Sequence, residues 1–189
     1  MKIYTKRGDT GETDLFGSGR VSKDALRVDT FGTVDECNAT IGVARAALTP
    51  VAEALDPILT RVQNELFALG AELASPGALD KVPLLQEASI ERLEHEIDHA
   101  ETLLAPLRNF ILPGGSASGA GLHLARTVAR RAERLAVSLA AVSRDNGEPL
   151  RPEVVRYLNR LSDHLFVHAR FANHLADMPE TAWLGRSAT

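Results

Sequence analysis

Apolar residues recur every three or four positions along most of the chain, which is the spacing of one face of an α-helix. The first such segment runs over residues 22–49. Ser22 is a typical N-cap residue with Asp24 in the following turn, and Thr49-Pro50 ends the segment. The pattern therefore predicts a helix that begins close to Ser22. Its apolar positions are Val34, Cys37, Ile41, Ala44 and Leu48.

The same spacing continues over residues 55–75 and 87–104 and predicts two more helices. Pro57 stands early in the second segment, where its missing N–H matters least, and Ser75-Pro76-Gly77 ends that segment. The third segment carries six acidic residues against the single Arg92, so we expect a solvated acidic outer face. The apolar positions are Leu55, Leu59, Val62, Leu66, Leu69 and Leu73, and then Ile90, Leu93, Ile97, Ala100 and Leu104.

Two longer helical segments follow a short apolar connection at residues 105–115, and Asp145-Asn146-Gly147 marks the turn between them. The seam of the fourth segment is rich in alanine, and small residues allow two helices to approach closely. Pro152 opens the fifth segment. The two seams are Leu122, Ala125, Ala129, Ala132, Ala136 and Leu139, and then Val154, Leu158, Leu161, Leu165, Ala169 and Ala172.

Five helices joined by short connections favour antiparallel neighbours. The sequence therefore predicts an all-α fold, an up-and-down five-helix bundle in a single domain over residues 1–189. Residues 1–21 would form an ordered N-terminal loop, residues 22–177 the bundle and residues 178–189 a tail. A helical bundle alone does not specify a function.

Charge and composition exclude several classes of protein. The net charge of −4 argues against nucleic acid as a main partner. The chain has no apolar run of about 18 residues, which argues against a membrane span, and its start lacks the apolar region of a secretory signal. Cys37 is the single cysteine, so there is no disulfide framework and we expect a reducing, cytoplasmic location.

Glycine is concentrated in two patches, and the first lies in residues 5–23, which we call the phosphate loop. Glycines let backbone N–H groups approach an anion, while hydroxyls add donors and basic side chains add charge. The P-loop motif GxxxxGK[ST] is absent, and the alternative is a flexible polar N-terminus. The candidate residues are Thr5, Lys6, Gly8, Thr10, Gly11, Thr13, Ser18, Arg20 and Lys23.

A second cationic group lies on the fourth predicted helix. Of the 21 basic residues 17 are arginine, and four of these fall within residues 126–134. Arg126, Arg130 and Glu133 share a face beside the alanine seam, with Arg134 next to them; we call these four residues the arginine face. Several guanidinium groups on one face suit a triphosphate or a carboxylate partner. The alternative is a solvated basic stripe with intrahelical pairs such as Arg130 with Glu133.

Three further features have open alternatives. Asp35 lies beside the apolar positions of the first helix with Arg126 as a candidate partner, or else it is an acid in water. Phe110 lies in the 105–115 connection, where such a residue usually packs on the core. Glu96-x-x-His99 has the spacing of a di-iron bundle, which needs two such motifs, whereas the sequence has one.

Four stretches resemble the ATP:cob(I)alamin adenosyltransferases of the propanediol-utilisation type. In family order they are TKRGDTGETDLFGSGRVSKD, GTVDECNATIG, FILPGGSASGAGLHLARTVARRAER and YLNRLSDHLF. Cys37 departs from the leucine usual in that family, which is a conservative change in the core. The resemblance implies a homotrimer of five-helix bundles with active sites between neighbouring subunits.

The resemblance implies transfer of the 5′-deoxyadenosyl group of ATP to cobalt(I) of a corrinoid such as cobalamin, with release of triphosphate. Phe110 would lie under the corrin and help displace its lower axial ligand, and Asp35 would pair with Arg126 across subunits. Magnesium would accompany the phosphates, with its protein ligands unidentified. The ATP site would be lined by Thr5, Lys6, Gly8, Asp9, Gly11, Thr13, Lys23, Arg130, Glu133, Arg134 and Asn159.

Cobalt(I) is a strong nucleophile, so this reaction needs no side-chain nucleophile, and preorganised cations would stabilise the leaving triphosphate. The implied protein partners are a reductase for cobalt and a cobalamin-dependent enzyme that accepts the product. The alternative function is a trimeric corrinoid or nucleotide carrier without catalysis.

Overall fold

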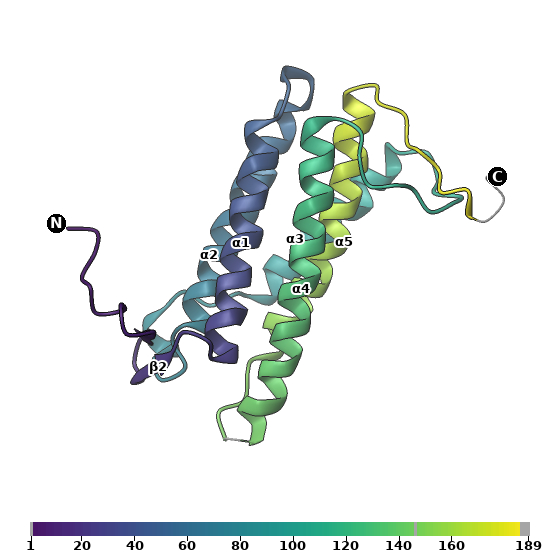
Figure 1. The fold of residues 1–189 in the computed structure, drawn as a ribbon. Coiled ribbons are helices and arrows are strands. Elements are labelled where there is room, and N and C mark those ends of the chain that lie inside the picture. The colour runs from purple at the N-terminus through teal and green to yellow at the C-terminus, as the bar shows by residue number, and fades with distance from the viewer. Residues whose placement is uncertain (1, 146, 186–189) are drawn as a thin grey trace.

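The computed structural model describes residues 2–145 and 147–185. It is a bundle of five helices, as predicted, with a two-stranded hairpin ahead of the first helix (Figure 1). No helix in this described part is long and apolar enough to cross a bilayer. The helices are α1 (Leu26–Ala46), α2 (Asp56–Leu73), α3 (Glu87–Thr102), α4 (Ala117–Asp145) and α5 (Pro152–Leu175); the 3₁₀ turns are η1 (Pro50–Leu55) and η2 (Leu79–Lys81), and the strands are β1 (Glu12–Asp14) and β2 (Arg20–Ser22).

Helix α4 lies at the centre of the bundle, because it packs against both α1 and α5. Helix α2 packs on α1, and α3 packs on α5 (Figure 1). The alanine seam makes this possible, since Ala125, Ala129 and Ala132 are completely buried. A Cβ atom at Gly121 would lie 3.0 Å from Ala44 of α1, so the backbones of α1 and α4 approach closely, as the small residues predicted.

The predicted beginning of the first helix is wrong. Ser22 is the last residue of β2, and α1 begins at Leu26 after Ala25, which has no side chain that could cap it. The N–H of Lys23 donates to the carbonyl of Gly11 at 2.8 Å, which extends the hairpin past Ser22. Ser22 and Lys23 therefore belong to the hairpin, because their backbone takes part in its hydrogen bonds and not in those of α1.

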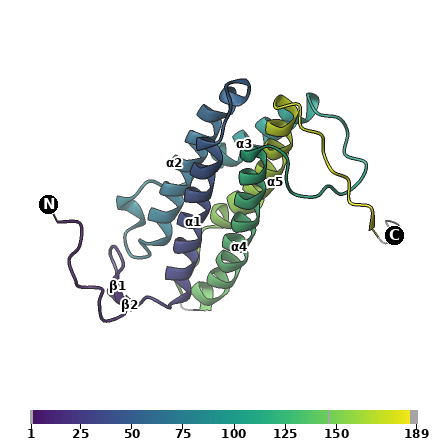
Figure 2. The ribbon, with the colours of Figure 1, turned by 45° about the horizontal axis from the view of Figure 1, so that its top comes forward.

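The hairpin rests on the segment that follows α2, residues 74–78, which we call the platform. The N–H of Phe16 donates to the carbonyl of Ala74 at 2.9 Å. Gly17 has a φ of 74°, and a Cβ atom at Gly77 would lie 2.2 Å from the carbonyl oxygen of Gly17, so both positions require glycine. The hairpin consequently sits beside the start of α1 (Figures 1 and 2).

The C-terminal residues are more ordered than a tail. Residues 178–185 turn back along the loop between α3 and α4, and Ile111 forms an antiparallel bridge with Ala182. Both views show these two stretches side by side, on the opposite side of the bundle from the hairpin (Figures 1 and 2). The rest of the predicted tail, residues 186–189, lies outside the described part.

A partly buried polar network joins α2, α3 and α5. Arg61 donates to Glu65 and to Glu96, each at 2.5 Å. The hydroxyl of Tyr157 donates to Glu65 at 2.8 Å, and Nε2 of His164 lies 2.8 Å from Oε2 of Glu96. Helix α3, which packs on α5, is thereby tied to α2 as well.

Candidate functional site

The first part of the phosphate loop folds into two tight turns ahead of β1. The N–H of Asp9 donates to the carbonyl of Lys6 at 3.3 Å, and the N–H of Gly11 donates to that of Gly8 at 3.2 Å. Lys6, with a φ of 63°, and Gly11, with a φ of 86°, both adopt left-handed backbone. A Cβ atom at Gly8 would lie 3.0 Å from Nζ of Lys23, so this ammonium group sits directly against the turn.

Arg20, which the sequence assigns to phosphate binding, contacts its own hairpin. Its Nη2 donates to the carbonyl of Arg7 at 2.7 Å, and its Nε lies 3.3 Å from the Glu12 carboxylate. These contacts fix the shape of the loop. Among the described residues Lys6 and Lys23 form no ion pair, so they are the cations of the loop best placed for an anion.

The four hydroxyl residues are spread along the hairpin. Thr5 accepts a long hydrogen bond of 3.4 Å from the N–H of Arg7, Thr13 is half-buried in β1, and Thr10 is exposed. Ser18 lies in the turn between β1 and β2, whereas the glycine turns and Lys23 lie at the open end of the hairpin. The structure thus separates Ser18 from the glycine turns and from Lys23.

The second predicted group lies on adjoining faces of α4 and α5. Nδ2 of Asn159 donates to Oε1 of Glu133 at 2.9 Å, so the fold brings together two residues predicted for one site. Arg134 donates to the carbonyl of Arg130 at 3.1 Å, and both arginines are exposed. In the described part of the chain, the intrahelical ion pair of Arg130 with Glu133 is not formed, which argues against the alternative of a self-paired stripe.

Arg126 and Arg130 line a hollow of about 380 Å³ together with Ser162, Asp163 and Phe166 of α5. Nε of Arg126 is shielded from solvent and has no hydrogen-bond partner among the described residues. Burial, and next the charge of Arg130, lower the pKa of Arg126. Because a partly buried cation without a counter-ion is unfavourable, an acidic group from outside this chain would be stabilised there.

Asp35 does not supply that acidic group within one chain. It is exposed on α1, and the described residues include no contact between Asp35 and Arg126. The neighbouring Glu36 pairs with Arg131 and links α1 to α4. The predicted pair of Asp35 with Arg126 therefore requires a second copy of the chain.

Phe110 lies outside the core, so the interpretation of it as a core residue is wrong. Its surface is 77 % exposed. The N–H of Trp183 donates to its carbonyl at 2.7 Å, and the two rings meet edge to face with centroids 6.3 Å apart. Together with Leu107, Arg108 and Leu184 they line a hollow of about 420 Å³.

Trp183 is a site candidate that the sequence did not reveal. No periodic pattern points to it, and only the pairing of residues 178–185 with the loop before α4 places it beside Phe110. Arg170, which is buried in α5, anchors that segment: its Nε donates to Glu180 at 2.6 Å and its Nη2 to the carbonyl of Ala105 at 2.8 Å.

The phosphate loop and the arginine face are the two cationic halves of the candidate site, and they do not meet in the part of the chain that the structure describes. Among the described residues, no hydrogen bond or ion pair joins the phosphate loop to the arginine face. No group of three or more His, Cys, Asp or Glu side chains in residues 2–145 and 147–185 is arranged to hold a metal ion. Cys37 is completely buried, and burial raises the pKa of its thiol to about 12, so it is a core residue rather than a nucleophile.

A family model described as cobalamin adenosyltransferase matches residues 3–172. The corrinoid adenosyltransferase of Bacillus subtilis is 48% identical over 176 residues, which cover 92% of this chain and 87% of that protein. The corrinoid adenosyltransferase of Citrobacter freundii is 42% identical over 179 residues, with 94% and 98% covered.

The fold is similar to a solved structure of a variant PduO-type ATP:corrinoid adenosyltransferase from Lactobacillus reuteri complexed with cobalamin and ATP. The TM-score is 0.88 at 35% identity, and the match covers 97% of this chain and 99% of the other.

Proposed function

The chain belongs to the cobalamin adenosyltransferase family and is an enzyme that transfers the adenosyl group of ATP to a corrinoid, and from that premise we propose where its substrates bind. The phosphate loop of one copy and the arginine face of a second copy bind the triphosphate of ATP between them. The observation that carries this proposal is the separation of the two cationic halves within one chain.

A closed ring of copies would complete every site, because the phosphate loop of each copy meets α4 of the next. We propose a homotrimer, the assembly implied by the family resemblance. The neighbouring copy would also supply Asp35 to Arg126, whose buried Nε lacks a partner among the residues that the structure describes.

The reaction needs charge stabilisation more than acid–base chemistry. Cobalt(I) attacks C5′ of the ribose with its electron pair, a cobalt–carbon bond forms, and the C5′–O bond breaks as triphosphate leaves. Lys6 and Lys23 on the loop and Arg130 and Arg134 on α4 would stabilise the charge that develops on the leaving group. Asn159 would hold Glu133 in place beside these arginines.

The corrinoid would bind at the hollow lined by Phe110 and Trp183. An exposed aromatic pair beside a leucine-lined hollow suits a large flat ring, because it offers apolar surface that excludes water. We propose that Phe110 displaces the lower axial ligand of cobalt, which would make reduction of cobalt(II) easier.

Magnesium would arrive with the phosphates of ATP. Each half of the proposed site offers a carboxylate, Asp9 on the loop and Glu133 on α4, and oxygen donors of this kind suit a hard cation. A reductase and a cobalamin-dependent acceptor enzyme are the expected protein partners, and the reducing cytoplasm is the expected location.

Complementation between two inactive variants tests the shared site. Lys23→Ala disables the loop half and Arg130→Ala disables the helix half. If the site is shared, co-expression of the two variants should restore about a quarter of wild-type activity, since a quarter of random neighbours pair an intact loop with an intact helix. If both halves act within one chain, mixing restores nothing.

Release of triphosphate separates the enzyme from the alternative of a carrier. Incubation with ATP, cobalamin and a reductant should produce adenosylcobalamin and triphosphate in equal amounts, and neither should form when the reductant is omitted. A carrier would bind both ligands without either product.

A further inference from the structure

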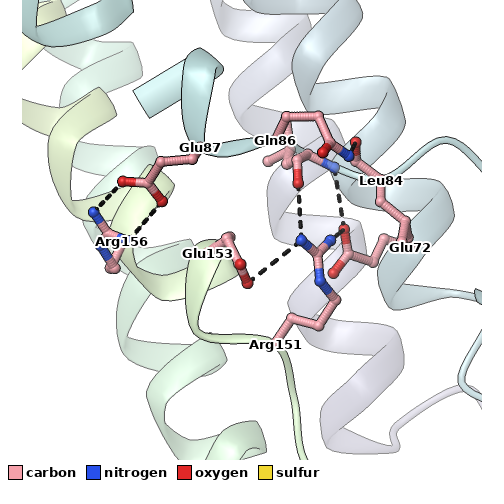
Figure 3. Close-up of polar contacts among 8 residues, drawn as sticks. Glu72, Leu84, Gln86, Glu87, Arg151, Glu153 and Arg156 are labelled. Atoms are coloured by element: carbon pink, nitrogen blue, oxygen red, sulfur yellow. Dashed lines mark hydrogen bonds and ion pairs between the residues drawn. The ribbon is translucent and has the colours of Figure 1, made fainter. Parts of the chain in front are cut away.

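Glu72 and Arg151 form a partly buried ion pair that belongs to none of the groups above. Glu72 lies in the last turn of α2 with 2 % of its surface exposed. Nη1 of Arg151 donates to Oε2 of Glu72 at 3.1 Å, and its Nη2 donates to the carbonyl of Leu85 at 3.0 Å (Figure 3). The N–H of Leu85 donates back to Glu72 at 3.4 Å. One guanidinium group thus ties together the end of α2, the chain before α3 and the start of α5.

This arrangement fixes geometry rather than adding much stability. Burial raises the pKa of Glu72, an effect that Arg151 opposes, and Oε1 of Glu72 has no partner among the described residues. A buried ion pair is commonly no more stabilising than apolar side chains of the same volume. Instead, the pair fixes the direction in which the chain continues after α2.

The platform begins two residues after Glu72 and carries the phosphate loop. Among the described residues, the bond from the N–H of Phe16 to the carbonyl of Ala74 is the backbone hydrogen bond that joins the hairpin to the bundle. Gly17 and Gly77 are in direct backbone contact beside it. A shift of the platform would therefore move the hairpin and, with it, the glycine turns and Lys23.

We propose that Glu72 and Arg151 are positioning residues for the ATP site. They hold the platform so that the hairpin presents Lys6, Gly8 and Lys23 toward the triphosphate, without touching the nucleotide themselves. This inference rests on the proposed function, in which the phosphate loop binds ATP.

Three variants test the inference through the KM for ATP and the KM for the corrinoid, measured separately. Glu72→Leu removes the tie but fills the space, and Gly77→Ala displaces the hairpin without touching the ion pair. Both should raise the KM for ATP roughly tenfold, which corresponds to about 1.4 kcal/mol, and leave the KM for the corrinoid within about twofold. Glu72→Gln keeps an acceptor for Arg151 and should restore the KM for ATP to within about threefold of wild type.

Glu87→Leu is the matched control for Glu72→Leu. Glu87 pairs with Arg156 on the neighbouring turn of α5, and both side chains are about half exposed, 48% and 53% (Figure 3). Loss of this exposed pair should change neither KM, because it ties no part of the platform.

The inference is overturned if Glu72→Leu leaves the KM for ATP unchanged, or if it raises both KM values equally while lowering the melting temperature. It is also overturned if Gly77→Ala has no effect on the KM for ATP. Lys23→Ala separates failure of the positioning role from failure of the proposed function. If Lys23→Ala does not raise the KM for ATP, the proposed function of the loop fails. If Lys23→Ala raises it and Glu72→Leu does not, only the positioning role fails.

Discussion

The amide of Asn159 on α5 holds the carboxylate of Glu133 on α4 through a hydrogen bond of 2.9 Å. This bond joins the two longest helices at the arginine face, where Arg130 and Arg134 lie on the same stretch of α4. An amide donor fixes the carboxylate without neutralising its charge, so Glu133 remains able to accept from a ribose hydroxyl or to face a metal ion.

Asn159→Ala should therefore weaken ATP binding while the fold is retained. Loss of one hydrogen bond to a charged group costs about 1.5–3 kcal/mol, so we expect kcat/KM for ATP to fall roughly tenfold to 150-fold. Arg156→Ala on the same helix is the control, because Arg156 pairs with Glu87 outside this face. Steady-state kinetics that show equal values for both variants would contradict the role of Asn159.

Arg130→Ala should abolish most adenosyl transfer through loss of triphosphate binding. Arg130 is exposed and forms no ion pair within the described chain, so its removal leaves no unpaired carboxylate behind and the melting temperature should change little. Arg131→Ala is a sharp comparison, because Arg131 is the next residue and pairs with Glu36 of its own chain. Arg131→Ala should retain activity. Near-normal turnover of Arg130→Ala would refute the assignment of the arginine face.

Phe110→Ala should retain ATP binding and lose most activity toward the corrinoid. The ring is exposed and contacts Trp183, so its removal opens no cavity in the core. Electronic absorption and electron paramagnetic resonance of bound cobalt(II) provide the measurement. Wild type plus ATP should give a four-coordinate signal that the variant lacks, and an unchanged signal would contradict displacement of the lower ligand by Phe110.

Asp35→Asn should weaken the contact between copies and lower activity. In the proposed assembly the substitution removes the charge that compensates the partly buried guanidinium of Arg126, whose pKa is lowered by burial. Size-exclusion chromatography with light scattering over a dilution series reports the assembly, and the assay reports the site. A trimer of unaltered stability with full activity would show that the pair is not formed.

The five helices followed from the sequence, because each seam has regular spacing and most helix ends have a turn signal. The alanine seam of α4 predicted a close approach to another helix, and the structure shows that this helix is α1. The hairpin did not follow: Ser22 reads as an N-cap by local chemistry, yet the N–H of Lys23 is taken by Gly11. The N-cap rule considers only neighbouring residues, and it failed here because the chain after Ser22 is held in the hairpin by its hydrogen bond to Gly11.

The candidate site residues were chosen from residue types and spacing, whereas their arrangement in space could not be predicted from the sequence. The glycines of the loop and the arginines of α4 led to the prediction of a polyphosphate site. In the structure Asn159 donates a hydrogen bond to Glu133, which was predicted for the same site. No feature of the sequence pointed to Trp183. The segment that pairs with it lies some 70 residues earlier in the chain, and neither segment has a periodic pattern from which the pairing could be predicted. The Arg20 side chain looked like a phosphate ligand by charge alone, but Glu12 and the carbonyl of Arg7 lie within its reach.

The stability of the protein should fall as the pH is lowered below about 6.5, through two buried histidines. The rings of His164 and His168 stack with centroids 3.9 Å apart, and burial lowers the pKa of each to about 3. Nδ1 of His164 lacks a partner among the described residues, which fits a neutral ring that donates from Nε2 to Glu96. Arg61 already pairs with Glu96, so that carboxylate does little to favour a charged His164.

Above pH 6.5 these histidines are neutral in both the folded and the unfolded state, and stability is full. As the pH falls toward 3, the unfolded chain binds protons that the folded chain does not, so the free energy of unfolding decreases by up to about 1.4 kcal/mol per pH unit for each histidine. Glu72 acts in the opposite sense, because its raised pKa lets the folded state take up a proton first.

Urea unfolding at about pH 7.5 and about pH 5 measures the net change in the free energy of unfolding. His168→Leu should remove up to about 2 kcal/mol of that change, whereas His99→Gln, at an exposed position of α3, should leave it intact. An identical pH dependence in wild type and His168→Leu would show that the pair does not control acid stability.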